Sequence, residues 1–246
     1  MTNDRYPKVS IVPASNENEI IRRLPRSEAE IILPRLSAID LPKGYALARQ
    51  GETIEYIYFL EDGICSIQSV STSGERTGVA LVGFDGVVPL SSALHITESF
   101  HDAIILIAGH GVRLSVRGLQ DVAAECPVFV DLLHRFSQNL ATQMSYTILT
   151  KAADHIPARF ARWLLMIHDR LRGEAIPLTH EEIGQALSIR RPTITTTLHL
   201  LEGERFIQSD RGQIVILDRE RLENFASSTY GTPEAEYVAL FPKPLD

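Results

Sequence analysis

The residues with the clearest chemical potential lie in the last third of the chain, where two arginines open a segment rich in small hydroxyl side chains. Arg190 and Arg191 stand directly before Pro192, and the polar positions that follow are Thr193, Thr195, Thr196 and His199. Guanidinium groups pair with phosphate oxygens or with the edge of guanine, and short hydroxyl side chains let a helix approach base edges closely. A helix that served only packing would more often carry Glu and Lys here. The pattern therefore indicates a helix that enters the major groove of double-stranded DNA.

Two short helices joined by a tight turn would present these side chains, and residues 178–202 contain the signals for both. Thr179 and Glu182 form a capping box that marks the start of the first helix. We expect Thr179 and His180, at this N-terminus, to meet a DNA phosphate. Pro192 is tolerated only in the first turn of a helix, so the second helix begins beside it. Apolar residues recur at spacings of three and four, which gives each helix one face to bury: Ile183, Ala186, Leu187, Ile194, Leu198 and Leu201.

A strand–turn–strand segment follows the second helix directly. Residues 206–217 contain two apolar runs separated by a polar turn with Arg211 and Gly212, and Asp218 then caps a last helix. A β-hairpin in this place is typical of a winged helix-turn-helix, in which Arg211 would contact a phosphate. The alternative is a small helical packing domain that happens to carry a hairpin.

The first half of the chain has the two-residue period of β-strands, interrupted by turn signals such as Asp62-Gly63. Residues 14–40 indicate one or two short helices, broken at Pro25 and Pro34. The expected strands are residues 56–60, 64–70, 77–82, 103–108 and 112–116. Short strands at this spacing favour an antiparallel sandwich or barrel. The predicted fold class is α+β, with an N-terminal antiparallel β-roll of the jelly-roll type, a long dimerisation helix and a C-terminal winged helix-turn-helix.

A long helix connects the two parts, from about Pro127 to Lys151. An apolar stripe recurs along it at Phe129, Leu133, Phe136, Leu140, Met144 and Ile148, of which the first five are the expected dimer contact. Such a stripe between two domains is suited to pairing with a second copy of the chain. The alternative is packing within the chain. The expected division is a sensor domain at 1–117, a connecting helix at 118–152, a DNA-binding domain at 153–230 and a C-terminal tail at 231–246.

Composition excludes several other classes of protein. The 246 residues are enough for two modest domains, and the net charge is −7. That charge argues against nucleic-acid binding, but acidic and basic residues balance within 151–231. No apolar run reaches the ~20 residues of a membrane span, and the first residues lack the layout of a signal peptide. Two cysteines, Cys65 and Cys126, are too few for a disulfide framework or an iron–sulfur cluster. We expect a cytoplasmic protein without a membrane partner.

Polar clusters elsewhere could support metal binding or catalysis, and neither is expected. Five potential ligands fall close together in the β-rich part: His95, Glu98, His101, Asp102 and His110. They lack the H-x-H pair with a following Glu of a metal-binding β-barrel, so no metal and no cofactor are predicted. One histidine would suffice to ligate a haem, and the sequence does not single one out. The serines at 91–92 do not form a G-x-S-x-G elbow, so the chain is not expected to be an enzyme.

A β-rich module, a long helix and a winged helix-turn-helix, in that order, resemble the Crp/Fnr family of bacterial transcription regulators. The likeness extends over roughly residues 30–228. It is strongest in 178–216, where Thr-His-Glu-Glu-Ile-Gly-Gln and Arg-Pro-Thr-Ile-Thr follow the family's pattern. Gly51-Glu52 and Gly63 look like the family's first β-roll hairpins. The resemblance implies a homodimer on a pseudo-palindromic operator, with a sensor that changes the spacing of two recognition helices.

The recognition helix departs from the cyclic-AMP-responsive members of that family. The resemblance places Arg191 where the family contacts a guanine. Those members then carry a Glu and a second Arg, where this chain has Pro192 and Thr196. Proline cannot accept a bond from cytosine, and threonine cannot make a bidentate contact with guanine. We therefore expect an operator that differs from the cyclic-AMP type.

The sensor pocket implied by the resemblance departs further. Family members that bind cyclic nucleotides hold the ribose with a Gly-Glu pair and neutralise the phosphate with a later Arg. Pro89-Leu90 and His101-Asp102 stand at these places here, and a carboxylate would repel the phosphate. We expect an effector pocket around Pro89, Leu90, Ser91 and His101, whose ligand is unknown and is not cyclic AMP bound in the usual way.

These observations predict a DNA-binding transcription regulator that acts as a homodimer. RNA polymerase would be a further partner if the regulator is an activator. One alternative is a β-barrel protein that binds a small molecule or metal and whose helix-turn-helix no longer binds DNA. Another is a regulator that is constitutively active and has an empty sensor domain.

Titration calorimetry with cyclic AMP and cyclic GMP tests the prediction for the sensor. Because no arginine stands at the phosphate position, we expect no binding of either nucleotide in the micromolar range. Micromolar binding would contradict the interpretation of Pro89-Leu90 and His101-Asp102.

Overall fold

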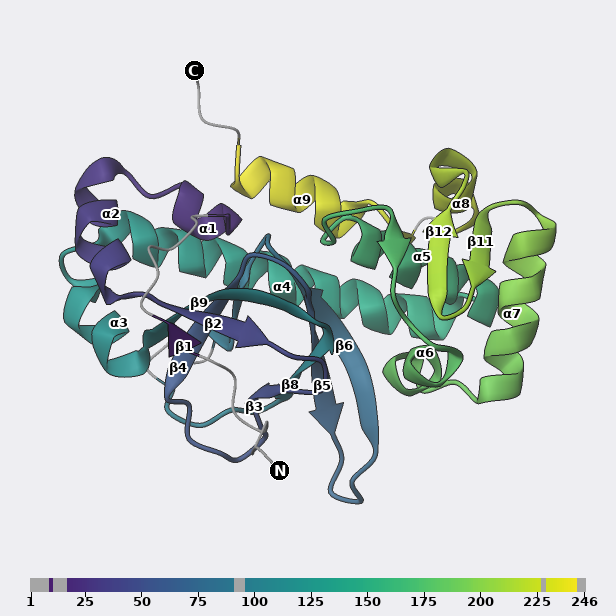
Figure 1. The fold of residues 1–246 in the computed structure, drawn as a ribbon, viewed down its shortest axis with the longest axis horizontal. Helices are drawn as coiled ribbons and strands as arrows, with labels where there is room; N and C mark the ends of the chain where they lie inside the picture. The colour runs from purple at the N-terminus through teal and green to yellow at the C-terminus, as the bar shows by residue number, and fades with distance from the viewer. Residues whose placement is uncertain (1–8, 11–16, 91–95, 227–228, 243–246) are drawn as a thin grey trace.

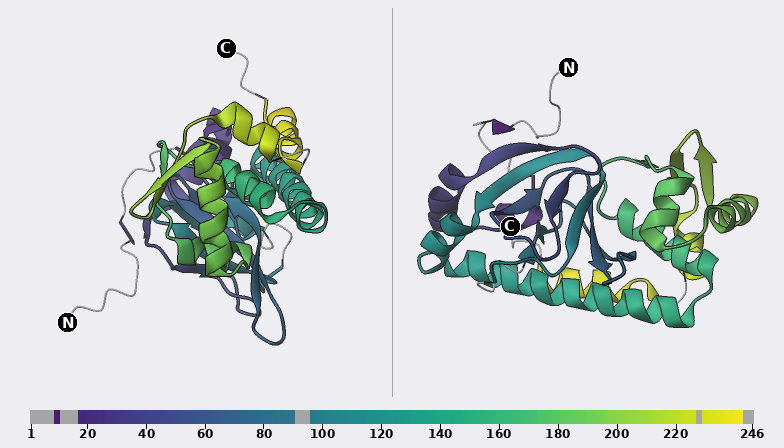
Figure 2. Two further views of the ribbon diagram at one scale, coloured as in Figure 1. Left: turned by 90° about the vertical axis from the view of Figure 1, so that its right-hand side faces the viewer. Right: turned by 90° about the horizontal axis from the view of Figure 1, so that it is seen from below.

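The computed structural model describes residues 9–10, 17–90, 96–226 and 229–242, and the predicted α+β fold is confirmed. Figure 1 shows a β-rich part at one end, a smaller part built mainly of helices at the other, and a long helix, α4, that extends from one toward the other. In Figure 2, α4 lies along one side of the molecule. Within the described residues, no helix is both long and apolar enough to cross a membrane.

Two antiparallel sheets form the β-rich part, with strand orders β1-β2-β9-β4-β7 and β3-β8-β5-β6. Inward side chains of both sheets, among them Phe59, Ile105 and Leu114, are almost fully buried in one common core, as in a β-sandwich. The five strands expected from the period of two correspond to β4, β5, β6, β8 and β9. The strands are β1 (Val9–Ser10), β2 (Ser37–Leu41), β3 (Ala46–Ala48), β4 (Tyr56–Leu60), β5 (Ile64–Val70), β6 (Arg76–Val82), β7 (Val87–Val88), β8 (Asp102–Ile107) and β9 (Gly109–Ser115).

Short helices cover one end of this β-roll, as expected for residues 14–40. They are α1 (Glu19–Arg22), α2 (Arg26–Ile32) and the 3-10 helix η1 (Leu33–Arg35). Asn18 caps α1 through its Oδ1, which accepts from the backbone nitrogen of Ile20 at 2.9 Å. Its Nδ2 donates to the carbonyls of Leu60, at 2.7 Å, and Gly86, at 2.8 Å. One buried side chain therefore ties the first helix to the sheet, because each of its polar groups finds a backbone partner.

The connecting segment forms two helices, α3 (Val116–Ala123) and α4 (Pro127–Ala153). The second begins at Pro127 as predicted, whereas α3 was not indicated by the periodicity. Glu28 of α2, buried at 5% exposure, accepts from the backbone nitrogens of Val128 at 2.9 Å and Phe129 at 2.8 Å. The first amides of a helix have no partner within the helix, and the helix dipole favours a negative charge beside them. Glu28 therefore fixes where α4 starts.

The apolar stripe of α4 faces its own chain, so the prediction that it forms the dimer contact is wrong. Phe129, Leu133, Phe136 and Leu140 are at most 7% exposed, and all four belong to the core of the β-roll. Met144, half-buried, packs against the same core, whereas Ile148 at the end of the predicted stripe is 68% exposed. A helical period identifies the face that is buried but not the surface that buries it. Here the nearest apolar surface is the sheet of the same chain, as in the alternative of packing within the chain.

The C-terminal part contains the elements expected of a winged helix-turn-helix. Strands β10, β12 and β11 form a small antiparallel sheet beside the helices. Asp218 caps α8 as predicted, because its Oδ1 accepts from the backbone nitrogen of Arg221 at 3.0 Å. The elements are α5 (Ile156–His168), β10 (Ala175–Ile176), α6 (His180–Leu187), α7 (Arg191–Gly203), β11 (Ile207–Asp210), β12 (Gln213–Ile216) and α8 (Arg219–Phe225).

The segment expected as a C-terminal tail contains a helix that the sequence did not indicate. Helix α9 (Thr232–Leu240) returns from the C-terminal part and packs along α4, as Figure 1 shows in yellow. Asn139 of α4 is buried, and its Nδ2 donates to the carbonyl of Pro233 at 2.7 Å and to Glu236 at 3.0 Å. The hydroxyl of Tyr237 donates to the carbonyl of Asp85 in the β-roll at 2.8 Å. Helix α9 thus links α4 to the sensor part.

Replacing Glu28 tests the anchoring of α4. We expect Glu28→Ala to lower the free energy of unfolding by about 1–3 kcal/mol, because two buried amides lose their acceptor. The matched control is Glu30→Ala on the same helix, whose exposed ion pair with Arg26 should matter by less than about 0.5 kcal/mol. Urea unfolding measures both variants, and equal losses would show that Glu28 has no capping role.

Candidate nucleic-acid interface

The turn between α6 and α7 is built from local backbone requirements. The predicted capping box is present: the Thr179 nitrogen donates to Glu182 Oε2 at 2.8 Å, and the Glu182 nitrogen donates to Thr179 Oγ1 at 3.4 Å. Ser188 ends α6 in the left-handed region, at φ 55°. A Cβ on Gly184 would lie 2.8 Å from the carbonyl oxygen of Ile189, so a residue without a side chain is required there. These constraints fix the orientation of α6 relative to α7.

The two faces of α7 separate as the sequence predicted. Ile194, Leu198 and Leu201 are at most 1% exposed and pack in the core of the C-terminal part. Of the predicted DNA-contacting residues, Arg190, Arg191, Thr196 and His199 are exposed, and His180, Thr193 and Thr195 are half-buried. Figure 1 places α7 at the far end of the molecule from α2 and α3. The structure therefore brings the α7 residues and His180 to one accessible surface, which we call the α7 face: His180, Arg190, Arg191, Pro192, Thr195, Thr196 and His199.

Hydroxyl groups on this face already have partners for their hydrogens. Thr196 Oγ1 donates to the carbonyl of Pro192 at 3.1 Å, and Thr195 Oγ1 lies 3.3 Å from the carbonyl of Arg191 and 3.4 Å from His180 Nδ1. A hydroxyl group has two acceptor lone pairs besides its single hydrogen. While these bonds persist, Thr196 can therefore accept from an amino group on a base edge, and its methyl group can contact the methyl group of thymine.

The arginines of this surface are not engaged by the protein. In the part of the chain that the structure describes, no carboxylate lies within 4.0 Å of Arg190 or Arg191, whereas Arg211 in the wing lies 4.0 Å from Asp210. The wing turn has Arg211 at φ 47° and Gly212 at φ 79°, as a two-residue hairpin turn requires. Arg211 and Thr179 are exposed beside the α7 face. Cationic groups without internal partners are available to an external anion.

The first helix of the turn is held against the β-roll. Lys43, in the loop between β2 and β3, pairs with Glu182 at 2.5 Å, and Ser188 Oγ donates to the carbonyl of Arg76 at 3.0 Å. A Cβ on Gly78 of β6 would come within 2.7 Å of the carbonyl oxygen of Ala186. Burial raises the pKa of Glu182, but hydrogen bonds from Lys43 and from Thr179 outweigh it, so the pKa lies below its usual value. The β-roll therefore contacts the helix-turn-helix directly.

Most of the predicted effector residues line one cavity in the β-roll. Pro89, Leu90 and His101 line it together, and Ser91 lies outside the described residues. Its volume is about 220 Å³, and its other walls are mainly apolar. Burial lowers the pKa of His101, which favours its neutral form. The remaining lining side chains are Ile67, Val88, Ile96, Ser99, Ala103, Ser137, Leu140, Ala141 and Met144.

The carboxylate of Asp102 does not line this cavity. It accepts from the backbone nitrogen of Gln50 at 2.9 Å and from Arg76 Nε at 3.2 Å. Neither a carboxylate nor a cation is among the described lining residues. The neighbouring group of possible metal ligands does not assemble, since no three His, Cys, Asp or Glu side chains gather for a metal within the described ranges, and His95 lies outside them. Ser99, Ser137 and Ala141 had no local sequence signal, because they come from elements distant in the chain.

Comparison with known proteins agrees with this geometry. Residues 158–225 match the family model of the Crp-like helix-turn-helix domain. The chain is 23% identical over 205 residues to a CRP-like cAMP-activated global transcriptional regulator of Mycobacterium tuberculosis, over 76% of this chain and 87% of that protein. Its fold is similar to that of FixK2 from Bradyrhizobium japonicum, with a TM-score of 0.68 at 20% identity over 78% of this chain and 98% of the other.

A Crp/Fnr-family regulator from Eubacterium rectale has a similar fold. The TM-score is 0.65 at 18% identity, and the likeness covers 87% of this chain and the whole of the other. The match to the helix-turn-helix model and the shared fold confirm the predicted resemblance.

Proposed function

We propose that this chain, a Crp/Fnr-type transcription regulator with a helix-turn-helix DNA-binding domain, binds a pseudo-palindromic operator as a homodimer. The observation that carries the proposal is the α7 face. Exposed cationic and hydroxyl groups gather there, backed by an apolar face that fixes the helix in place. Residues in a helix packed this way can enter a major groove without disturbing their own core.

Each group on and beside the α7 face has a proposed role. Arg191 donates to a guanine, Arg190 and Thr193 lie at the edge of the same groove, and the other α7 residues contact neighbouring bases. Thr179 and His180, at the N-terminus of α6, and Arg211, in the wing, contact phosphates. Pro192 and Thr196 replace the acceptor and the second guanidinium of the cyclic-AMP type. The half-site read by this helix therefore differs from that type.

The dimer contact is proposed for an exposed face of α4, which borders the β-roll cavity at Ala141 and α9 at Gln138. Exposed or half-exposed residues recur there at alternating spacings of four and three, the spacing of a coiled-coil seam. Small side chains such as Ala141 and Ser145 would let two helices approach closely, and Ile148, 68% exposed, would supply apolar contact. We call this set the α4 stripe: His134, Gln138, Ala141, Ser145, Ile148 and Ala152.

The cavity in the β-roll is the proposed effector site, and its walls constrain the ligand. Apolar side chains with a neutral His101 and the hydroxyls of Ser99 and Ser137 favour an uncharged, mostly apolar molecule. A cyclic phosphate would lose its hydration without gaining a cation. Ala141 belongs both to the cavity wall and to the α4 stripe, so a ligand would act where two chains meet. RNA polymerase is a further partner if the regulator activates transcription.

Substitution of Arg191 tests the DNA contact. We expect Arg191→Ala to weaken operator binding by about 1–3 kcal/mol, because a bidentate pair with guanine is lost. The control is Arg117→Ala, an exposed arginine on α3, which should bind as the unchanged protein does. Fluorescence anisotropy with a selected operator measures both, and unchanged affinity of Arg191→Ala would remove this residue from the interface.

A charge on the α4 stripe tests the dimer. We expect Ile148→Glu to weaken self-association at least roughly tenfold, because two carboxylates would face each other across the seam, and tenfold corresponds to about 1.4 kcal/mol. The matched control is Val238→Glu on α9, where the side chain is also 68% exposed but lies off the stripe. Sedimentation velocity distinguishes the variants, and a fully dimeric Ile148→Glu protein would place the contact elsewhere.

A further inference from the structure

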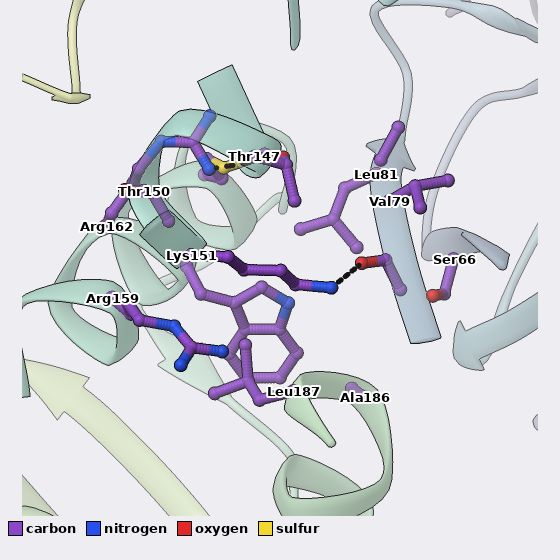
Figure 3. Close-up of a pocket in the computed structure, with 14 residues that line it drawn as sticks. Ser66, Val79, Leu81, Thr147, Thr150, Lys151, Arg159, Arg162, Ala186 and Leu187 are labelled. Atoms are coloured by element: carbon purple, nitrogen blue, oxygen red, sulfur yellow. Dashed lines mark hydrogen bonds between the residues drawn. The ribbon is translucent and has the colours of Figure 1, made fainter. Parts of the chain in front are cut away.

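A second, smaller cavity lies where five elements meet, and it is separate from the proposed effector site. Its walls come from β6 of the β-roll, the C-terminal half of α4, α5 and α6 of the helix-turn-helix, and from β5, which contributes Ser66. Figure 3 shows Lys151 reaching across it from α4 toward β6, with Arg159 on the same side and Ala186 and Leu187 below. Apolar side chains of Val79, Leu81, Trp163 and Met166 complete the wall.

Three cationic side chains line this cavity without a matching set of anions. Apart from Asp154, no carboxylate of the described residues lies within 4.0 Å of a charged nitrogen of Lys151, Arg159 or Arg162. Elsewhere in the interior, Arg170 pairs with Asp85 at 2.8 Å. Asp154 acts electrostatically on Arg159 and Arg162 but accepts hydrogen bonds from Thr150 at 2.8 Å and Thr229 at 2.6 Å. Glu234 also acts electrostatically on Arg162. Two carboxylates therefore stand against three cations, and the local charge is positive.

The environment of these cations is unfavourable for positive charge. Burial lowers the pKa of Lys151, and the neighbouring positive charge of Arg159 lowers it further. Burial also lowers the pKa of Arg159 and of Arg162. Arg162 is 3% exposed. Its Nε donates to the carbonyl of Thr229 at 2.9 Å and its Nη1 to Thr147 Oγ1 at 3.4 Å, while its Nη2 is buried without a hydrogen-bond partner among the described residues. Lys151 and Arg159 are half-buried. Positive charge that is partly removed from water and incompletely balanced is costly, and an anion would offset that cost.

We propose that this cavity binds a small oxyanion, of the size and charge of phosphate, through Lys151 and Arg159. Its volume is about 30 Å³, and one water needs roughly 10–15 Å³, so the space holds a few waters or one such anion. Lys151 also donates to Thr77 Oγ1 and to the carbonyl of Gly78 at 3.4 Å. An anion seated there would bridge α4 and α5 at the point where β6 contacts α6. The binding itself does not depend on the proposed DNA contacts.

The test is thermal unfolding of the full-length protein with inorganic phosphate, at constant ionic strength maintained with sodium chloride and in the absence of DNA. At phosphate roughly tenfold above its dissociation constant, we expect the midpoint to rise by about 3–6 °C. Arg159→Gln and Lys151→Gln should each abolish most of that rise. Arg117→Gln, which removes an exposed charge on α3, should retain it.

A further variant distinguishes this cavity from the proposed DNA-binding surface, which could also attract phosphate. Arg191→Gln should keep the full phosphate response. A response that survives in Arg159→Gln and Lys151→Gln but disappears in Arg191→Gln would overturn the proposal, as would the absence of any phosphate-specific rise in the unchanged protein. Hydrogen exchange gives an independent readout, since phosphate should slow exchange in α6 of the unchanged protein and not in Arg159→Gln.

Discussion

The packing of α4 against the β-roll of its own chain is the contact on which the other elements depend. Phe129, Phe136 and Leu140 bury one face of this 27-residue helix in the core of the sensor part. Glu28 fixes its start, and α9 covers a second face through Asn139. The α4 stripe lies on the part of the helix that these contacts leave exposed. The same helix leads into α5, so the orientation of the helix-turn-helix follows from where α4 lies.

Short polar contacts connect the sensor part to the helix-turn-helix. His101 lines the proposed effector cavity, and the next residue, Asp102, accepts a hydrogen bond from the side chain of Arg76. The backbone carbonyl of Arg76 in turn accepts a hydrogen bond from Ser188, in the turn between α6 and α7. On the other side, Arg170 at the end of α5 pairs with Asp85 in the β-roll. Close contact between Gly78 and Ala186 leaves little room for α6 to move without β6. A ligand that shifts β6 or β8 would therefore also displace the turn between α6 and α7, because packed elements move between discrete arrangements.

Local signals in the sequence predicted local structure well. Thr179, Glu182 and Pro192 define the helix-turn-helix because caps and proline act within one turn of a helix. Strands β4, β5, β6, β8 and β9 followed from their period, whereas β1, β2, β3 and β7 did not. Contacts between distant segments left no such signal. The apolar stripe of α4 was assigned to a partner chain because periodicity shows which face of a helix is buried and not which surface covers it. Helix α9 was missed because its apolar and polar residues are not segregated. Glu28 and Val128 are 100 residues apart, and the effector cavity combines β-strand, loop and α4 residues.

Hydroxyl-radical footprinting on DNA selected from a random library tests the central claim, that two copies joined along α4 present two α7 helices to one face of the duplex. The account predicts two protected segments, related by a two-fold axis and separated by one helical turn, about 34–36 Å, or a multiple of it. Their protection should appear together as protein is added. Protection of a single half-site at saturation, or no protected sequence after selection, would contradict it.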